Sequence, residues 1–91
     1  MANAKNYSML NGKLNITGLI IKDFRSKYHL SRQQLSDKLM IMGYDIPANS
    51  IYDIETGTRT VSDYEICAIA KALNICVTEL LEEYFNSIES A

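Results

Sequence analysis

Apolar residues recur every three or four positions along most of this chain, on a polar background. This spacing places them on one face of a helix, and it starts at Ile16. The first stripe predicts a helix over about 16–28, with apolar positions Ile16, Leu19, Ile20, Phe24 and Tyr28. Residues 1–14 have no such stripe, so we expect a short N-terminal arm, with a hairpin at Asn11-Gly12 as the alternative.

Capping signals predict where the second and third helices begin and end. Ser31 and Gln34 match a capping box, in which each side chain accepts from the backbone N–H of the other residue. Gly43 is a natural terminator of the second helix, Pro47 suits the first turn of the third, and Gly57 ends it. The apolar faces of these helices consist of Leu35, Leu39 and Met42, and of Ile51 and Ile54.

A second capping box, at Ser62 and Glu65, opens a fourth helix, and a fifth begins near Val77. Their apolar stripes are Ile66, Ile69, Ala70 and Leu73, then Val77, Leu80, Leu81, Tyr84, Phe85 and Ile88. The pattern predicts an all-α fold, in which residues 15–91 form a compact bundle of about five helices after an arm of residues 1–14.

Composition agrees with one helical domain. A chain of 91 residues has room for one hydrophobic core, and 47% apolar against 22% charged residues is a globular balance. Four Gly and one Pro are too few for the frequent turns of a β-sandwich. The sequence has neither the long apolar run of a membrane span nor an export signal, so we expect a soluble, cytoplasmic protein.

Candidate chemistry is sparse. Cys67 and Cys76 are too few for a disulfide scaffold, and together with the single histidine, His29, they do not form the clustered ligands of a metal site. No nucleophile has an adjacent base, and there is no Gly-rich phosphate loop. We therefore expect no metal, no cofactor and no enzymatic activity.

The net charge of −2 hides a strong split along the chain. Residues 1–38 contain seven Lys or Arg and two Asp, a net charge of +5. Residues 39–91 contain two Lys or Arg and nine Asp or Glu, a net charge of −7. The split leaves room for a basic face on the folded domain although the whole chain is acidic.

The second and third helices have the ingredients of a helix-turn-helix. Both are short, a glycine-bearing turn separates them, and Leu35 and Leu39 can pack against Ile51 and Ile54. Many small helical bundles share this pattern, so the pattern alone does not distinguish a DNA-binding motif from another bundle.

Particular residues add a resemblance to a known family. They are Arg25 and the segments 30–36 (LSRQQLS), 50–59 (SIYDIETGTR), 64–73 (YEICAIAKAL) and 75–81. Together they resemble the Cro/CI-type (XRE) family of helix-turn-helix transcriptional regulators. The most specific part is I-x-x-I-E-x-G-x-R followed by I-A-x-A-L. The resemblance implies a lambda-repressor-like DNA-binding fold and a small regulator, expected to be a repressor, with double-stranded DNA as its partner.

In that family the second helix crosses the phosphate backbone and the third lies in the major groove. By position, the resemblance implies base-reading roles for Ala48, Asn49, Ser50 and Asp53, phosphate contacts for Arg32, Gln33 and Arg59, and a structural ion pair between Arg25 and Glu55. Asn49 suits adenine, whose N6 and N7 match an amide. Asp53 is open to two interpretations, a cytosine contact or a solvated acid that repels phosphate.

The connection between the second and third helices departs from the family pattern, because residues 40–50 make it several residues longer than usual. We expect the extra residues to lengthen the second helix, since Ile41 and Met42 suit an exposed loop poorly. The alternative is a flap that turns Tyr44 and Asp45 towards DNA.

Two further hypotheses concern partners. Tyr84, Phe85 and Ile88 extend the final stripe beyond what a five-helix core needs, which favours a homodimer through this helix; packing back over the first helix is the alternative. A dimer would also supply two recognition helices for two half-sites. The rival to DNA binding is a protein-interaction or dimerisation module of the same fold, antirepressor or antitoxin-like, which the acidic net charge favours and the candidate DNA contacts oppose.

Overall fold

Five α-helices make up the regular structure of the described chain. The computed structural model describes residues 12–90, with side chains up to Asn86. The helices are α2 (Gly18–Lys27), α3 (Arg32–Ile41), α4 (Ala48–Thr56), α5 (Asp63–Ala72) and α6 (Val77–Ser90). No strand occurs within residues 12–90, and the predicted all-α class is confirmed. Residues 1–11 of the expected arm, and with them the hairpin alternative, lie outside the described residues.

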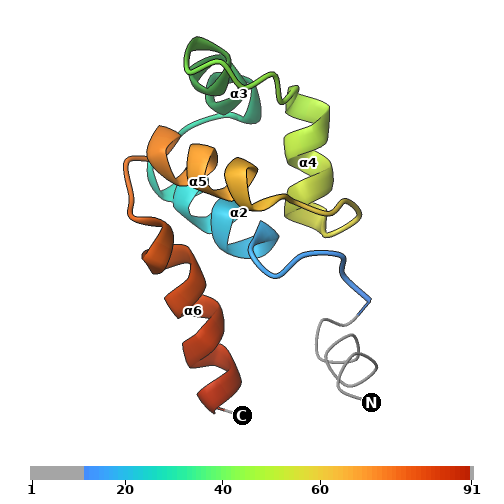
Figure 1. Cartoon of the computed structure of the whole chain (residues 1–91), viewed down its shortest axis with the longest axis vertical. Helices are drawn as coiled ribbons and strands as arrows, with labels where there is room; N and C mark the ends of the chain where they lie inside the picture. The colour runs from blue at the N-terminus through green and yellow to red at the C-terminus, as the bar shows by residue number, and fades with distance from the viewer. Residues whose placement is uncertain (1–11, 91) are drawn as a thin grey trace.

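α2 and α5 occupy the middle of the molecule (Figure 1). α3 and α4 pack against each other at one end, with α4 also on α2 and α3 on α5, and α6 packs on α2 and α5 at the other end. None of the helices in residues 12–90 has the length and apolar character needed to cross a bilayer.

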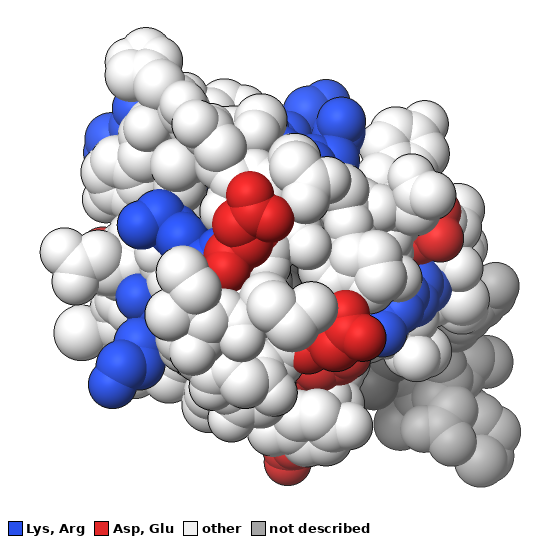
Figure 2. Space-filling view, turned by 90° about the horizontal axis from the view of Figure 1, so that it is seen from above, with Lys and Arg blue, Asp and Glu red and all other residues white. Residues whose placement is uncertain are grey.

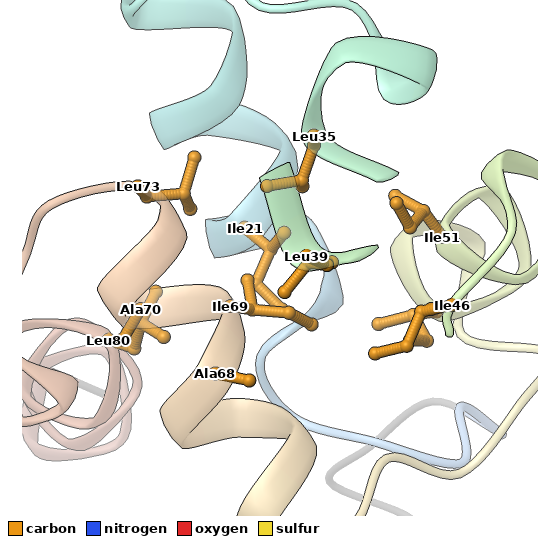
Figure 3. Packing of buried hydrophobic residues seen from close by; sticks show 11 residues of the cluster. Ile21, Leu35, Leu39, Ile46, Ile51, Ala68, Ile69, Ala70, Leu73 and Leu80 are labelled. Carbon is orange, nitrogen blue, oxygen red and sulfur yellow. The ribbon is translucent and has the colours of Figure 1, made fainter. Parts of the chain in front are cut away.

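One hydrophobic cluster joins all five helices. Ile21, Leu39 and Ile69 lie at its middle, and Leu80 attaches α6 beside Ala70 (Figure 3). Its buried members are Ile21, Leu35, Leu39, Ile46, Ile51, Ile54, Ala68, Ile69, Ala70, Leu73 and Leu80. This cluster includes the Leu35, Leu39, Ile51 and Ile54 wedge expected of a helix-turn-helix.

The buried face of α2 differs from the predicted stripe. Leu19 and Tyr28, which the spacing placed in the stripe, are 66% and 44% exposed. The buried line runs instead through Thr17, Ile21 and Arg25, four residues apart. Hydrophobicity alone could not reveal this face, because two of its three members are polar.

The predicted caps are present at both capping boxes. The Gln34 N–H donates to Ser31 Oγ (3.0 Å) and the Ser31 N–H to Gln34 Oε1 (2.8 Å), and Ser62 and Glu65 repeat the arrangement. Gly57 ends α4 in the left-handed conformation with φ of 80°. Pro47 was expected in the first turn of α4. It lies one residue before the helix instead, because its ψ of 158° is extended.

The long α3–α4 connection is anchored at its end. α3 continues to Ile41, so the helix contains Met40 and Ile41, yet burial does not explain this because Ile41 is 88% exposed. Met42 and Tyr44 are half-buried against the core, and Ile46 enters it. Ser36 Oγ in α3 donates to the Ile46 carbonyl (2.8 Å), which fixes the chain before α4 begins.

The Thr17 hydroxyl is the one buried side-chain oxygen or nitrogen without a hydrogen-bond partner among the described residues. Thr17 is 0% exposed and lies directly before α2. A buried hydroxyl that loses water and gains no partner destabilises the folded state.

We therefore expect Thr17→Val, which keeps the shape and removes the hydroxyl, to raise the free energy of unfolding by about 1 kcal/mol. Denaturant unfolding followed by circular dichroism measures this change. Thr78→Val on exposed α6 surface is the matched control, with an expected change within about 0.5 kcal/mol. A loss of stability in Thr17→Val would show that the hydroxyl makes a favourable interaction.

Candidate nucleic-acid interface

A buried ion pair anchors the C-terminal part of α4 to α2. Arg25 Nε lies 2.7 Å from Glu55 Oε2, and Arg25 Nη2 donates to Glu55 Oε1 at 3.1 Å. The Glu55 side chain is fully buried and the Arg25 side chain is 10% exposed. Arg25 Nη1 also donates to the Leu30 carbonyl (2.7 Å), which ties the α2–α3 turn to the same group. The structure thus brings together the two residues that the resemblance paired.

Arg32, at the start of α3, shares the same carboxylate. Its Nε donates to Glu55 Oε1 at 3.0 Å, and its guanidinium carbon lies 4.9 Å from the centre of the Tyr52 ring. This is a cation–π contact with a side chain of α4. Within residues 12–90 the two terminal nitrogens of Arg32 have no hydrogen-bond partner, and the side chain is 34% exposed.

The cluster therefore holds two guanidinium groups and one carboxylate, a net charge of +1. The single negative charge is buried, whereas Arg32 reaches the surface with its terminal N–H groups unused. Its anchored Nε and the Tyr52 ring restrict the rotamers of Arg32, so the guanidinium is oriented before any ligand arrives.

Arg59, the other arginine placed on phosphate by the resemblance, has a partner in the protein. Its Nη2 and Nη1 donate to Glu65 Oε2 (2.9 Å) and Oε1 (3.2 Å), and Nη1 also donates to the Thr60 carbonyl. These hydrogen bonds lower the pKa of Glu65 below its ordinary value of 4.5, against the opposing effect of burial. The pKa of Arg59 is raised, mainly by Glu65 and in smaller part by the charge of Asp53.

The candidate base-reading residues lie on the first two turns of α4. Asn49 and Asp53 are exposed, whereas Ala48 and Ser50 are half-buried. Among residues 12–90, no group forms a hydrogen bond with the Asn49 amide. Tyr52, on the same helix, is 50% exposed, and its ring contacts the Arg32 guanidinium. The polar groups of Asn49 are consequently free to bind a ligand.

Gln33 is exposed on the first turn of α3, but its amide already donates to Asp37 Oδ1 at 2.9 Å. This i, i+4 contact on a helix surface is weak enough to be exchanged for another acceptor. Gln33 is therefore accessible, whereas Arg59 is held more firmly because it donates two hydrogen bonds to one carboxylate.

Basic side chains do not form one continuous patch on the end of the molecule formed by α3 and α4. Figure 2 shows Lys and Arg at separate places on this face, with Asp and Glu between them. The expected basic half is divided because two of its arginines, Arg25 and Arg32, form ion pairs with Glu55 of the second half, and Arg59 of the second half pairs with Glu65.

The exposed stripe of α6 borders a shallow hollow of about 410 Å³. Leu81 and Phe85 are 42% and 57% exposed, and Tyr84 is half-buried. The hollow is lined by Ile16, Thr78, Leu81, Glu82, Tyr84 and Phe85. The side chain of Ile88, the third expected interface residue, lies outside the described part of the chain.

Comparison with family models identifies the family to which this fold belongs. The model of the Helix-turn-helix family HTH_3 matches residues 21–80, which run from the buried face of α2 to α6. The chain belongs to the Cro/CI-type (XRE) helix-turn-helix family. As a Cro/CI-type protein it has the DNA-binding domain of a transcriptional regulator. No curated protein and no solved structure is significantly similar to it.

Two features of the Cro/CI-type domain were not predicted from its sequence. The pairing of Arg32 with both Glu55 and Tyr52 had no visible signal, because the three residues meet only after α3 and α4 pack. Asn15 also went unnoticed, although an Asn three residues before Gly18 is a recognisable helix-start signal. In the described chain no group of three or more His, Cys, Asp or Glu side chains is arranged to hold a metal ion.

We expect Glu55→Gln to lower the free energy of unfolding by about 3 to 5 kcal/mol, because it leaves Arg25 buried without a countercharge. Denaturant unfolding measures the loss. Glu83→Gln, which removes the same charge from an exposed site on α6, is the control and should change stability by less than about 0.5 kcal/mol. Equal stability of the two variants would mean that the ion pair does not hold α4.

Proposed function

We propose that this Cro/CI-type protein binds double-stranded DNA with sequence specificity, with α4 in the major groove, and acts as a repressor. The observation that carries the proposal is the contrast between the two faces of α4. Its inner face is fixed by a buried, shared ion pair, while the outer polar groups of Asn49 have no partner in the described chain. Rigid support beneath free polar groups is what base reading requires. DNA binding alone is sufficient to block a promoter, which favours repression over activation.

Asn49 is the proposed reader of one base, most simply adenine through N6 and N7. Ala48 and Ser50 lie beside it in the same turn, and Asp53 follows one turn later. Asp53 would accept from cytosine N4 if it reaches a base edge. Its charge also favours the position of Arg59, so a purely structural role competes with base reading.

Arg32 is the proposed principal phosphate contact. Its Nε is used by Glu55, and its two terminal nitrogens face no acceptor among the described residues. Phosphate can therefore bind without breaking the ion pair. Gln33 lies next to it at the N-terminus of α3, where backbone N–H groups favour an anion. For Arg59, phosphate binding would require partial release of Glu65.

Substitutions should separate base reading from phosphate contact. Asn49→Ala should weaken binding to the preferred operator by about 1 to 3 kcal/mol and leave the affinity for random duplex almost unchanged. Arg32→Ala should weaken binding to all sequences and reduce the slope of log affinity against log salt by about one. Fluorescence anisotropy with a fragment selected from genomic DNA and with random duplex measures both.

The charge-matched control for Arg32→Ala is Lys71→Ala, which lies on α5 in a hollow shared with α6. It should leave the affinity for both duplexes within about twofold. If Asn49→Ala lowers the affinity for operator and for random duplex equally, Asn49 does not read sequence. An unchanged salt slope in Arg32→Ala would remove Arg32 from the phosphate contacts.

We also propose a homodimer through α6, because Leu81 and Phe85 are exposed beside an apolar hollow. A dimer would place two copies of α4 on half-sites about 34 Å apart. Tyr84 and Ile88 complete the proposed interface. Glu82 at the edge of the hollow would face solvent at the rim.

Sedimentation at micromolar concentration should show a dimer. Phe85→Glu should be monomeric, because dimerisation would bury the introduced carboxylate in the interface. Tyr64→Glu, on an exposed aromatic residue of α5, is the control and should remain dimeric. A monomer that Phe85→Glu leaves unchanged would contradict the dimer.

A second candidate function is a protein-interaction module of the same fold. Two observations favour it: the face shown in Figure 2 has no continuous basic patch, and Arg59 is paired with Glu65. Affinity for random duplex at low and high salt discriminates the two functions. A DNA-binding protein loses affinity steeply as salt rises, whereas an interaction module shows no such dependence.

A further inference from the structure

The side chain of Asn15 joins the start of α2 to the end of α4. Its Nδ2 donates to the carbonyl of Ile54 (2.9 Å), within α4, and to the carbonyl of Arg59 (2.8 Å), just beyond it. Its Oδ1 accepts from the N–H of Gly18, the first residue of α2 (2.7 Å). An amide side chain offers two donors and an acceptor, and this network uses all three functions.

Lys13 and Leu14, which precede Asn15, also bind the C-terminal end of α4. Lys13 Nζ donates to the Thr56 carbonyl (2.9 Å), and the Leu14 N–H donates to the Gly57 carbonyl (2.8 Å). The last carbonyls of a helix lack partners within the helix, and a cation near them is favourable. Residues 13–15, which we call the clamp, thus form a C-terminal cap of α4; its side-chain contacts span 39 to 44 positions in sequence.

Gly18 allows the clamp to close. A Cβ at this position would overlap the carbonyl oxygen of Ile54, the same oxygen that accepts from Asn15. The backbones of α2 and α4 are therefore in direct contact at this point, and the distance between them is fixed by backbone atoms rather than by flexible side chains.

α2 consequently holds α4 at two points. One is Gly18 with Asn15 at its N-terminus, and the other is Arg25, seven residues further along, which binds Glu55. Seven helical residues separate the two points by roughly 10 Å. One point of attachment would leave α4 free to rotate against α2, whereas two fix its direction.

From these contacts we infer that Asn15 is a positioning residue for DNA reading, which sets the direction of α4 without touching DNA. The inference rests on the proposed function, because it takes α4 as the reading helix. Substituting a residue that positions a reading helix should weaken affinity for the preferred operator more than affinity for random duplex. Base contacts depend on geometry more strongly than phosphate contacts do.

Asn15→Asp tests the role in the full chain. Aspartate keeps the acceptor for the Gly18 N–H, so α2 remains capped, but it has no donors and places a carboxylate against two carbonyls. We expect the Kd for a selected operator fragment to rise about tenfold, as the loss of two hydrogen bonds implies, with the Kd for random duplex within about threefold. Both are measured by anisotropy at a temperature where the variant is folded.

Leu80→Val is the matched control, because Leu80 is fully buried in α6, and α6 packs on α2 and α5 rather than on α4. It lowers stability without acting on the clamp. Its Kd for the operator should stay within about twofold of the wild-type value while the thermal midpoint falls. If Asn15→Asp and Leu80→Val change operator affinity equally, or if Asn15→Asp weakens both duplexes equally, the positioning role is wrong.

Hydrogen exchange separates this result from a failure of the proposed function. In Asn15→Asp the amides of Gly57 and Thr58, which close the end of α4, should exchange at least about tenfold faster, while the Ile69 amide of α5 should not change. If the wild-type protein binds no DNA, faster exchange at these amides still supports the clamp and the proposed function alone fails. Unchanged exchange at Gly57 and Thr58 would overturn the clamp whatever the DNA result.

Discussion

The orientation of α4 depends on one buried carboxylate. A fully buried charge is unfavourable unless it is paired, so Glu55 depends on Arg25, and Arg32 gives the same carboxylate a second partner. Those two residues lie on α2 and α3, so three helices must be correctly placed before both contacts form. The hydrophobic cluster supplies most of the driving force for folding, but apolar contacts are not directional. The ion pair adds a directional contact to α4 that apolar packing does not supply.

The same use of charge explains why an acidic protein can present a DNA-binding fold. Arg25 and Arg32 of the first half do not simply add to a surface potential, because Glu55 of α4, in the second half, binds both of them. Within the second half, Arg59 is likewise bound by Glu65, which also caps α5 and so belongs to two local structures at once. What remains at the surface of the cluster is one oriented guanidinium, that of Arg32. Specificity in such a site comes from placement rather than from total positive charge.

Local rules predicted the features that depend on a few neighbouring residues. Both capping boxes, the left-handed Gly57 and the helical class follow from short-range hydrogen bonding, and the sequence shows them directly. The buried side of α2 could not be predicted in this way, because the buried Arg25 is acceptable only when Glu55 arrives from 30 positions away. The exposure of Ile41 could not be predicted either, because the hydrogen bond between Ser36 and Ile46, rather than burial of Ile41, holds the α3–α4 connection. For the site, residue similarity indicated the positions, whereas the partners of Arg32 and Arg59 depend on tertiary packing.

The unequal attachment of the residues on α4 has an evolutionary consequence. Glu55 cannot change alone, because Arg25 would lose its countercharge, so positions 25, 32 and 55 are expected to vary together in descendants of this protein. Asn49 is under no such constraint within the described chain, because its side chain contacts no other hydrogen-bonding group there. Under the proposed function, changes at this position would alter which operators are bound while the fold persists. A lineage of such regulators would then diverge in the sites they recognise without passing through unstable intermediates.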